Sequence, residues 1–502
     1  MIELNIILSQ NQIGARDGSP CGTAVRFAVR VPQEACRAVM LLREAARPAV
    51  VREHRLAPWF AVAAVCFGAF MGQLDASVVT LAFPALQRQF AVGLAGVQWV
   101  SLAYLLVLVV LLVPVGRWSD RVGRKLVYLY GFLLFTAASA GCGLAWSLGA
   151  LIALRVLQAA GAAMLQANSV ALVAISAPAG RRRAALGIQA AAQALGLALG
   201  PVAGGLLLSA SGWRWIFFIN VPVGAAAMAA GWFLLPRTRH QAGRTGADPL
   251  GLVLLATGVT AVLIAVSAVS GLGVPGWAAA GFAGLAALAG PGLLWWERRA
   301  ASPLVDVPML AARGMAGLAG ALCAYMVLFG PLVLFPQVLS AHGDSPLRIG
   351  LILSALPAGF GLAAVCAERV LPTRWTNRRR CAAGGVLASG CAAALAIPAS
   401  PAVVALLLAL LGVGLGVYIP ANNAAIMAAV PSRGAAAAGG MVNMARGLGT
   451  ALGVAAVSLA LHAAASAGPA MLTLAAFGLA AAWAGHAAGA RDRHDASSPG
   501  GG

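Results

Sequence analysis

Long apolar segments dominate this chain. They recur between Leu56 and Gly489, and each is about 20 residues long, the length of a helix that crosses the hydrocarbon core of a bilayer. Within lipid every backbone polar group must be hydrogen-bonded inside its own segment, and a helix meets that requirement. Charged residues make up 10% of the 502 residues, whereas soluble globular domains carry about 25%. The sequence therefore predicts an all-α integral membrane protein.

Fourteen transmembrane helices are expected from the apolar segments and the polar breaks between them. They are predicted at about 57–83, 95–115, 126–146, 148–175, 185–210, 213–235, 250–271, 276–296, 315–340, 348–368, 381–398, 402–429, 435–466 and 469–488. Long polar loops at 236–249 and 297–314 set a central pair apart from six helices on each side. This 6+2+6 arrangement divides the chain into a basic cytoplasmic tail (1–56), a six-helix half (57–236), two inserted helices with linkers (237–297), a second six-helix half (298–489) and a disordered tail (490–502).

Positive charge is concentrated in alternate loops. The chain has 34 Lys and Arg against 14 Asp and Glu, a net charge of +20. Most of the basic residues lie in the tails and in the loops at 116–125, 177–184, 236–249, 297–314, 369–380 and 430–434. A face that binds nucleic acid would not skip every second loop, whereas the positive-inside rule produces this alternation. We therefore expect no nucleic-acid partner, and we expect both termini in the cytoplasm.

The basic residues also indicate a source. Lys125 is the only lysine, and the excess of arginine, with abundant Ala and Gly, suggests a GC-rich bacterial genome. The expected location is thus the bacterial plasma (inner) membrane. There we expect a multi-pass protein in contact with membrane lipid, and we expect it to be a monomer.

One acid lies deep within a predicted span. Asp75 is such an acid in the first span, and an intramembrane acid is a functional candidate because burying its charge is costly. Arg155 in the fourth span lies at similar depth, since each residue is about seven or eight positions from the outer end of its span. We hypothesise that they form a proton-coupling pair, which protonation of Asp75 loosens. The alternative is a carboxyl that only packs a helix bend.

The fourth and fifth spans carry further patterns. Gln158 and Gln166 share a helical face with Arg155, which favours a water-filled cavity over hydrogen bonds that merely join helices. The fifth span has a ladder of Gln189 and Gln193 followed by Gly196, Gly200, Pro201, Gly204 and Gly205. Small residues four apart let another backbone approach closely, and a proline kinks a helix, so this span is expected to form a packed, flexible seam.

A charged loop is predicted between the second and third spans. It runs Gly-Arg-Trp-Ser-Asp-Arg-Val-Gly-Arg-Lys, and its marked residues are Gly116, Asp120, Arg121, Gly123, Arg124 and Lys125. The glycines allow a tight turn. We expect a cytoplasmic latch that holds the inner helix ends together. A loop that only sets topology is the alternative.

These motifs resemble those of the major facilitator superfamily, in particular its fourteen-spanner drug:proton antiporters. Leu74 to Val79 resembles the family's first-helix motif, Gly116–Lys125 its loop motif, Arg155–Gly161 its fourth-helix motif and Gly196–Gly205 the fifth-helix motif of antiporters. Further runs similar to the family contain Gln98 and Tyr104, and Asn443 and Arg446. With Asn422, these residues complete the cavity candidates: Gln98, Tyr104, Gln158, Gln166, Gln189, Gln193, Asn422, Asn443 and Arg446.

The resemblance implies a function. It implies proton-coupled efflux of lipophilic, often cationic compounds such as drugs or antibiotics, with the proton gradient as the energy source and no cofactor. The middle helices are expected to offer no second buried acid, so a proton and a cationic substrate would both rely on Asp75. Export of a physiological solute such as a lipid or amino acid stays open.

An enzyme or a sensor is a remote alternative. A membrane-embedded enzyme needs clustered acids, histidines or a nucleophile with its base, and neither such a cluster nor metal-site spacing is present in the sequence. We therefore expect neither an enzyme nor a metal site. A sensor needs an output domain, for which the tails leave little room.

Overall fold

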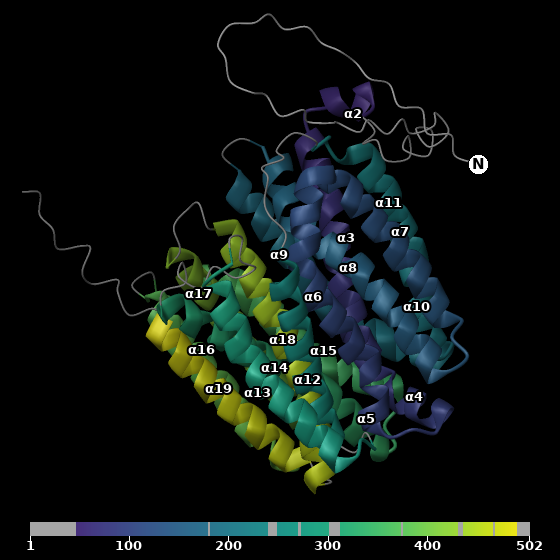
Figure 1. Ribbon diagram of the computed structural model, residues 1–502, viewed down its shortest axis with the longest axis vertical. Helices are drawn as coiled ribbons and strands as arrows, with labels where there is room; N and C mark the ends of the chain where they lie inside the picture. The colour runs from purple at the N-terminus through teal and green to yellow at the C-terminus, as the bar shows by residue number, and fades with distance from the viewer. Residues whose placement is uncertain are drawn as a thin grey trace, which may run out of the picture. The chain divides into compact units, whose positions relative to one another are not determined.

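The apolar segments form long helices in the computed structural model (Figure 1). The structure describes residues 47–178, 181–238, 248–269, 273–300, 312–372, 375–429, 435–464 and 467–488. Within these ranges every regular element is a helix, because each long apolar segment satisfies its own backbone hydrogen bonds. Most of both predicted tails, 1–56 and 490–502, lies outside the described residues.

The first group of helices precedes residue 239. Its members are α2 (Ala49–Glu53), α3 (Ala57–Leu81), α4 (Phe83–Phe90), α5 (Leu94–Val97), α6 (Trp99–Val122), α7 (Arg124–Gly143), α8 (Leu148–Ser176), α9 (Arg182–Ala210), α10 (Arg214–Phe218) and α11 (Asn220–Leu234). The predicted sixth span, 213–235, is thus divided into α10 and α11. The predicted first span ends two residues early, at Leu81, and the short helix α4 follows it.

The second group follows. Its members are α12 (Pro249–Val269), α13 (Gly276–Glu297), α14 (Ala312–Ala341), α15 (Pro346–Val370), α16 (Asn377–Ala394), α17 (Pro401–Ala428), α18 (Ala435–Ala464) and α19 (Ala467–Ala488). Thirteen of the described helical segments are long and apolar enough to cross a membrane. The predicted eleventh span, 381–398, corresponds to α16, which is not among the thirteen. Its 18 residues include Arg378, Arg379 and Arg380 in the first turn.

The prediction of a loop at 116–125 was wrong. The helix α6 continues through Gly116 to Val122, and α7 begins at Arg124. Gly123 alone separates the two helices, and its φ of 118° is one that L side chains rarely adopt. A helix can therefore extend past the point where its sequence turns from apolar to charged, and one glycine makes the break.

Two regions supply most of the contacts between the first six spans and the last six, and α14 also touches α3 and α4. The helix α9 packs along α15, and α6 packs along α18. Within each group the helices pack against their neighbours: α3 lies on α9 and α8, α7 lies on α8, and α16 lies against both α17 and α19. The side chains between the two groups therefore form a central region, and the cavities around Arg446 described below lie there.

The inserted helices form a hairpin at the side of this bundle. The helix α13 packs on α12, and α12 in turn lies against α6 and α18. Gln98, at the start of α6, donates a hydrogen bond to Ser267 Oγ of α12 at 3.2 Å. The hairpin is thus fixed to both six-helix groups through α12.

The prediction that the middle helices offer no second buried acid was wrong. Asp248 and Glu297 have exposed fractions of 7% and 2%. Asp248 precedes α12, where its Oδ1 accepts hydrogen bonds from Gly251 N and Trp296 Nε1, both at 2.9 Å. The two acids lie at the ends of α12 and α13, where they cap the hairpin. Because neither lies deep within a predicted span, depth within a span did not predict their burial.

Candidate functional site

A buried ion pair lies inside the first six-helix group. Asp75 on α3 and Arg155 on α8 have exposed fractions of 0% and 1%. Their atoms Oδ2 and Nη1 are 2.7 Å apart. The predicted pair at equal depth is therefore present in the structure. A charge buried in this way requires a partner, because an isolated one is strongly destabilising.

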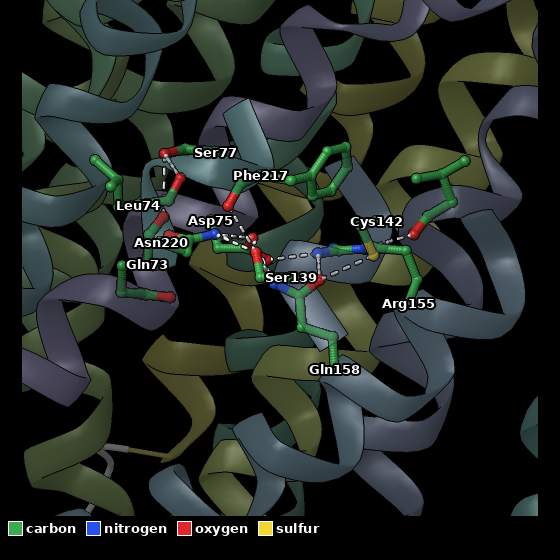
Figure 2. A network of polar contacts seen from close by, with 11 residues as sticks. Gln73, Leu74, Asp75, Ser77, Ser139, Cys142, Arg155, Gln158, Phe217 and Asn220 are labelled. Atoms are coloured by element: carbon green, nitrogen blue, oxygen red, sulfur yellow. Dashed lines mark hydrogen bonds and ion pairs between the residues drawn. The ribbon is translucent and has the colours of Figure 1, made fainter. Parts of the chain in front are cut away.

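Asp75 accepts three hydrogen bonds. Arg155 Nη1 donates to its Oδ2, while Gln158 Nε2 and Asn220 Nδ2 donate to its Oδ1, each at 3.0 Å. Figure 2 shows these side chains converging from α3, α8 and α11. Ser139 Oγ of α7 accepts from both amides, at 3.2 Å from Gln158 and 3.1 Å from Asn220. An ionised carboxylate only accepts hydrogen bonds, so three donors match the ionised form.

Arg155 is held from several sides. Its Nε donates to the carbonyl of Val100 at 3.1 Å, and its Nη1 also donates to Gln158 Oε1 at 2.7 Å. Its Cζ lies 4.1 Å from the centroid of the Tyr104 ring, a favourable cation–π position. The guanidinium is therefore fixed to α6 as well as to α3, which connects the ion pair to another helix of the bundle.

Ser139 and Asn220 belong to this network although neither was among the site residues predicted from sequence. The sequence signal of Asn220 was an amide in an otherwise apolar helix, a residue that commonly faces a neighbouring helix. Ser139 carried little signal, because a hydroxyl can bond to its own helix. In this fold Ser139 Oγ donates instead to the carbonyl of Phe217 at 2.9 Å.

A second polar cluster surrounds Arg446 of α18. Its Nη2 donates to Gln166 Oε1 at 2.8 Å, and its Nη1 donates to Gln193 Oε1 at 3.2 Å. Gln166 lies on α8 and Gln193 on α9, so these bonds join the two six-helix groups. Two adjoining cavities flank the guanidinium, and we call them the Arg446 cavities. They share the lining residues Gly72, Gln73, Gln166, Asn443 and Arg446.

The Arg446 cavities are small in this conformation. The space open to the centres of water molecules is about 30 Å³ in one and about 20 Å³ in the other, enough for one or two waters each. Tyr104, Tyr325 and Phe329 line the first cavity, and Ser169 and Gln193 line the second. A drug-sized molecule requires these walls to move apart.

The nine cavity candidates divide into two sets. Five of them line at least one Arg446 cavity: Tyr104, Gln166, Gln193, Asn443 and Arg446. Gln98, Gln158, Gln189 and Asn422 line neither of these two cavities. Gln98 anchors α12, Gln158 bonds to Asp75, and Asn422 Nδ2 donates to the carbonyl of Gly317 on α14 at 2.9 Å. Gln189 is buried in α9, with an exposed fraction of 2%.

The glycines of α9 permit close packing on two sides. A Cβ at Gly196 would meet the carbonyl oxygen of Phe70 on α3, and one at Gly200 would meet Ser77 Oγ. On the other side, a Cβ at Gly205 would lie 3.1 Å from Leu347 Cα of α15. Gly204 faces Val78 of α3. The predicted seam thus connects the helix that carries Asp75 to the second six-helix group, with α9 continuous through Pro201.

Lys125 does not reach the second six-helix group through its described hydrogen bonds. It is fully buried, and its Nζ donates to the carbonyls of Trp232 and Leu235 at 2.9 and 2.8 Å. These carbonyls lie at the C-terminal end of α11, so Lys125 caps that helix. Its positive charge also interacts favourably with the helix dipole. Gly116 lies within α6 and Arg124 begins α7. The side chains of Asp120 and Arg121 lie outside the described part of the structure, and the latch stays a prediction.

The chain is similar to known transporters. The profile of the Major Facilitator Superfamily matches residues 65–454. The tetracenomycin C resistance and export protein of Streptomyces glaucescens is 30% identical over 403 residues, which cover 79% of this chain and 75% of that protein. The riboflavin transporter RibZ of Clostridioides difficile (strain 630) is 28% identical over 402 residues, covering 79% of this chain and 87% of that protein.

The fold is also found in solved structures. One is a bacterial homolog to the human lysosomal transporter Spinster, in an inward-facing and occupied conformation, with a TM-score of 0.62 and 16% sequence identity. The similarity covers 87% of this chain and 97% of that one. Members of the matched family are transporters and not enzymes. With its many apolar helices, the chain is therefore a multi-pass bacterial membrane transporter and belongs to the Major Facilitator Superfamily.

Proposed function

We propose that this protein is a proton-coupled efflux transporter that exports drugs, antibiotics or related lipophilic metabolites across the plasma membrane by alternating access. The observation that carries the proposal is the buried pair of Asp75 on α3 and Arg155 on α8, two helices that also line the Arg446 cavities. The export direction is supported by the similarity to a protein named for resistance and export. A proton that moves down about 100 mV releases about 2.3 kcal/mol, enough for roughly a fiftyfold gradient of a neutral solute.

Protonation of Asp75 would change the contacts of α3. A protonated carboxyl becomes a donor at one oxygen, where the ionised form accepts from Arg155, Gln158 and Asn220. The contact with Arg155 weakens, and α3 loses part of its attachment to α8. Because α3 packs on α9, and α9 packs on α15, this change biases the contact between the two six-helix groups.

The topology of the proposed transporter has fourteen spans. The helix α16 is the additional one, since it packs against α17 and α19, which are both long enough to cross the membrane. Its three arginines occupy one end, where long side chains reach the interface. An even number of spans places both termini on the same side, which the basic tails and loops identify as the cytoplasm. We propose the 6+2+6 division and a monomer on this basis.

Proton flux in inside-out vesicles tests the coupling. Vesicles with an acidic lumen receive a panel of antibiotics, and luminal pH is followed with a fluorescent dye. The protein should release protons when a transported compound is added. Asp75→Asn should abolish this release, whereas Asp344→Asn, which changes an acid outside the membrane-spanning helices, should retain it. Wild-type flux in Asp75→Asn would show that Asp75 is not the coupling residue.

Export of a physiological solute is the second candidate. The similarity to a protein named as a riboflavin transporter supports it. The same vesicles, given riboflavin, amino acids and lipids instead of antibiotics, separate the two functions. Expression in an efflux-deficient host provides the matching measurement, because a drug exporter lowers susceptibility to its compounds and Asp75→Asn should not.

A further inference from the structure

We propose that the Arg446 cavities bind organic anions with an aromatic body, and that Arg446 is the residue that recognises the anionic group. This inference rests on the proposed export function and specifies its substrate class. It differs from the lipophilic or cationic substrate that the sequence resemblance implies.

The charge of the cavities supports an anion. Among the residues that line the two cavities, Arg446 carries a charge and every other residue is neutral. Its hydrogen bonds go to the amide oxygens of Gln166 and Gln193, which are uncharged. Among the described residues no ion pair joins Arg446 to a carboxylate. Among the described residues this guanidinium is therefore compensated by amide dipoles and by the ring of Tyr325, whose centroid lies 6.0 Å from its Cζ, and a bound anion would supply the missing negative charge.

The nearby acid is not available to a cation. Asp75 is fully buried and forms its ion pair with Arg155. It lines neither cavity, and the ring of Tyr104 lies between Arg155 and the first cavity. A cationic compound in these cavities would meet the charge of Arg446 without an acid to balance it. Like charges in a site of low dielectric repel strongly, so the cavities disfavour such compounds.

The shape and chemistry of the lining specify the rest of the ligand. Guanidinium binds a carboxylate through two parallel hydrogen bonds, which suits the Nη1 and Nη2 atoms now bonded to two amides. The rings of Tyr104, Tyr325 and Phe329 line the same space, and they favour a flat aromatic body. Aromatic carboxylates and phenolates combine both features. They would displace the amide oxygens of Gln166 and Gln193 and so widen the cavities.

Transport of matched acids and amines by the purified, full-length protein in liposomes tests this inference. Fluorescein and rhodamine 123 share a xanthene ring but carry opposite charges at neutral pH, and 1-naphthoate and 1-naphthylmethylamine form a second pair. The acids should be transported. Arg446→Gln should reduce their transport about tenfold, the loss expected for a charged hydrogen bond. Arg446→Lys should retain more transport than Arg446→Gln, and Arg299→Gln, an exposed arginine on the hairpin, should transport normally.

The outcomes separate this inference from the proposed function. Transport of amines but not acids would overturn the inference and leave proton-coupled export standing. Acid transport that Arg446→Gln does not reduce would also overturn it, provided that the variant elutes as a monodisperse protein. Transport of neither pair would overturn the inference too, while the proton-flux experiment with Asp75→Asn independently decides the export function.

Discussion

The ring of Tyr104 lies over the guanidinium of Arg155, with 4.1 Å between the ring centroid and Cζ. The same ring lines the first Arg446 cavity. Tyr104 therefore touches the buried ion pair on one side and the cavity on the other. A compound that displaces this ring changes the surroundings of Arg155 directly, which offers a short physical connection between ligand binding and the proposed proton site.

Substitution of Tyr104 tests that connection. Tyr104→Leu removes the ring and about 1 kcal/mol of cation–π interaction, so the number of protons moved per transported molecule should fall. Tyr104→Phe retains the ring, and the Tyr104 hydroxyl has no hydrogen-bond partner among the described residues. Its coupling should stay close to that of the unmodified protein. Equal coupling ratios in the two variants would refute the role of the ring, with coupling measured as proton flux divided by solute flux.

The stability of the ion pair can be measured by unfolding in detergent. Asp75→Asn leaves Arg155 buried without a carboxylate, and the free energy of unfolding should fall by roughly 3 kcal/mol. The double variant Asp75→Asn with Arg155→Gln removes the uncompensated charge and should regain part of that loss. If the double variant is less stable than Asp75→Asn, the pair does not behave as a buried charge and its partner.

Glycine packing between the two six-helix groups predicts a strong steric effect. A Cβ at Gly350 of α15 would meet the carbonyl oxygen of Pro201 on α9, whereas one at Gly281 of α13 would meet no atom within 4 Å. Gly350→Ala should lower transport and thermal stability, because two backbones must separate. Gly281→Ala should leave transport unchanged and stabilise the protein by about 0.5–1 kcal/mol through helix propensity. Transport assays and thermal unfolding of both variants check this, and normal transport by Gly350→Ala would contradict it.

Thiol labelling tests whether α16 crosses the membrane. In a background without cysteine, Ser400→Cys lies just before α17, and Asn377→Cys lies at the other end of α16. An impermeant maleimide should label Ser400→Cys in intact cells and Asn377→Cys only in inside-out vesicles. Labelling of both positions from one side would show that α16 does not span the bilayer. That result would contradict the fourteen-span topology.

Much of the fold follows from hydrophobicity, whereas helix ends do not. The apolar segments predicted where the long helices lie, because the need for internal hydrogen bonds in lipid admits few alternatives. The helix through Gly116 to Val122 was missed because charge marks the membrane surface and not the end of a helix. Its end depends on Gly123, whose backbone conformation is not visible in hydropathy.

The depth of the candidate-site residues in the membrane could be predicted from the sequence, but the partner that each side chain contacts could not. Asp75 and Arg155 could be paired because each is a charge at a similar distance from the membrane surface. Gln158 and Gln166 both follow the face of Arg155, yet Gln158 bonds to Asp75 and Gln166 lines the cavities. Which partner each glutamine meets depends on the helix that packs opposite, and one helix's periodicity does not contain that information.

The way α12 lies along both α6 and α18 has a consequence for how compounds reach the transporter. The two six-helix groups meet at this flank and at the flank of α9 and α15, where Gly350 and Pro201 bring the backbones together. In the described part of the chain α12 therefore covers one flank, and backbone contact closes the other. Under the proposed export function, compounds would enter from the water at the membrane surface, and their free concentration in the cytosol, rather than their partitioning into the bilayer, would govern which of them are exported.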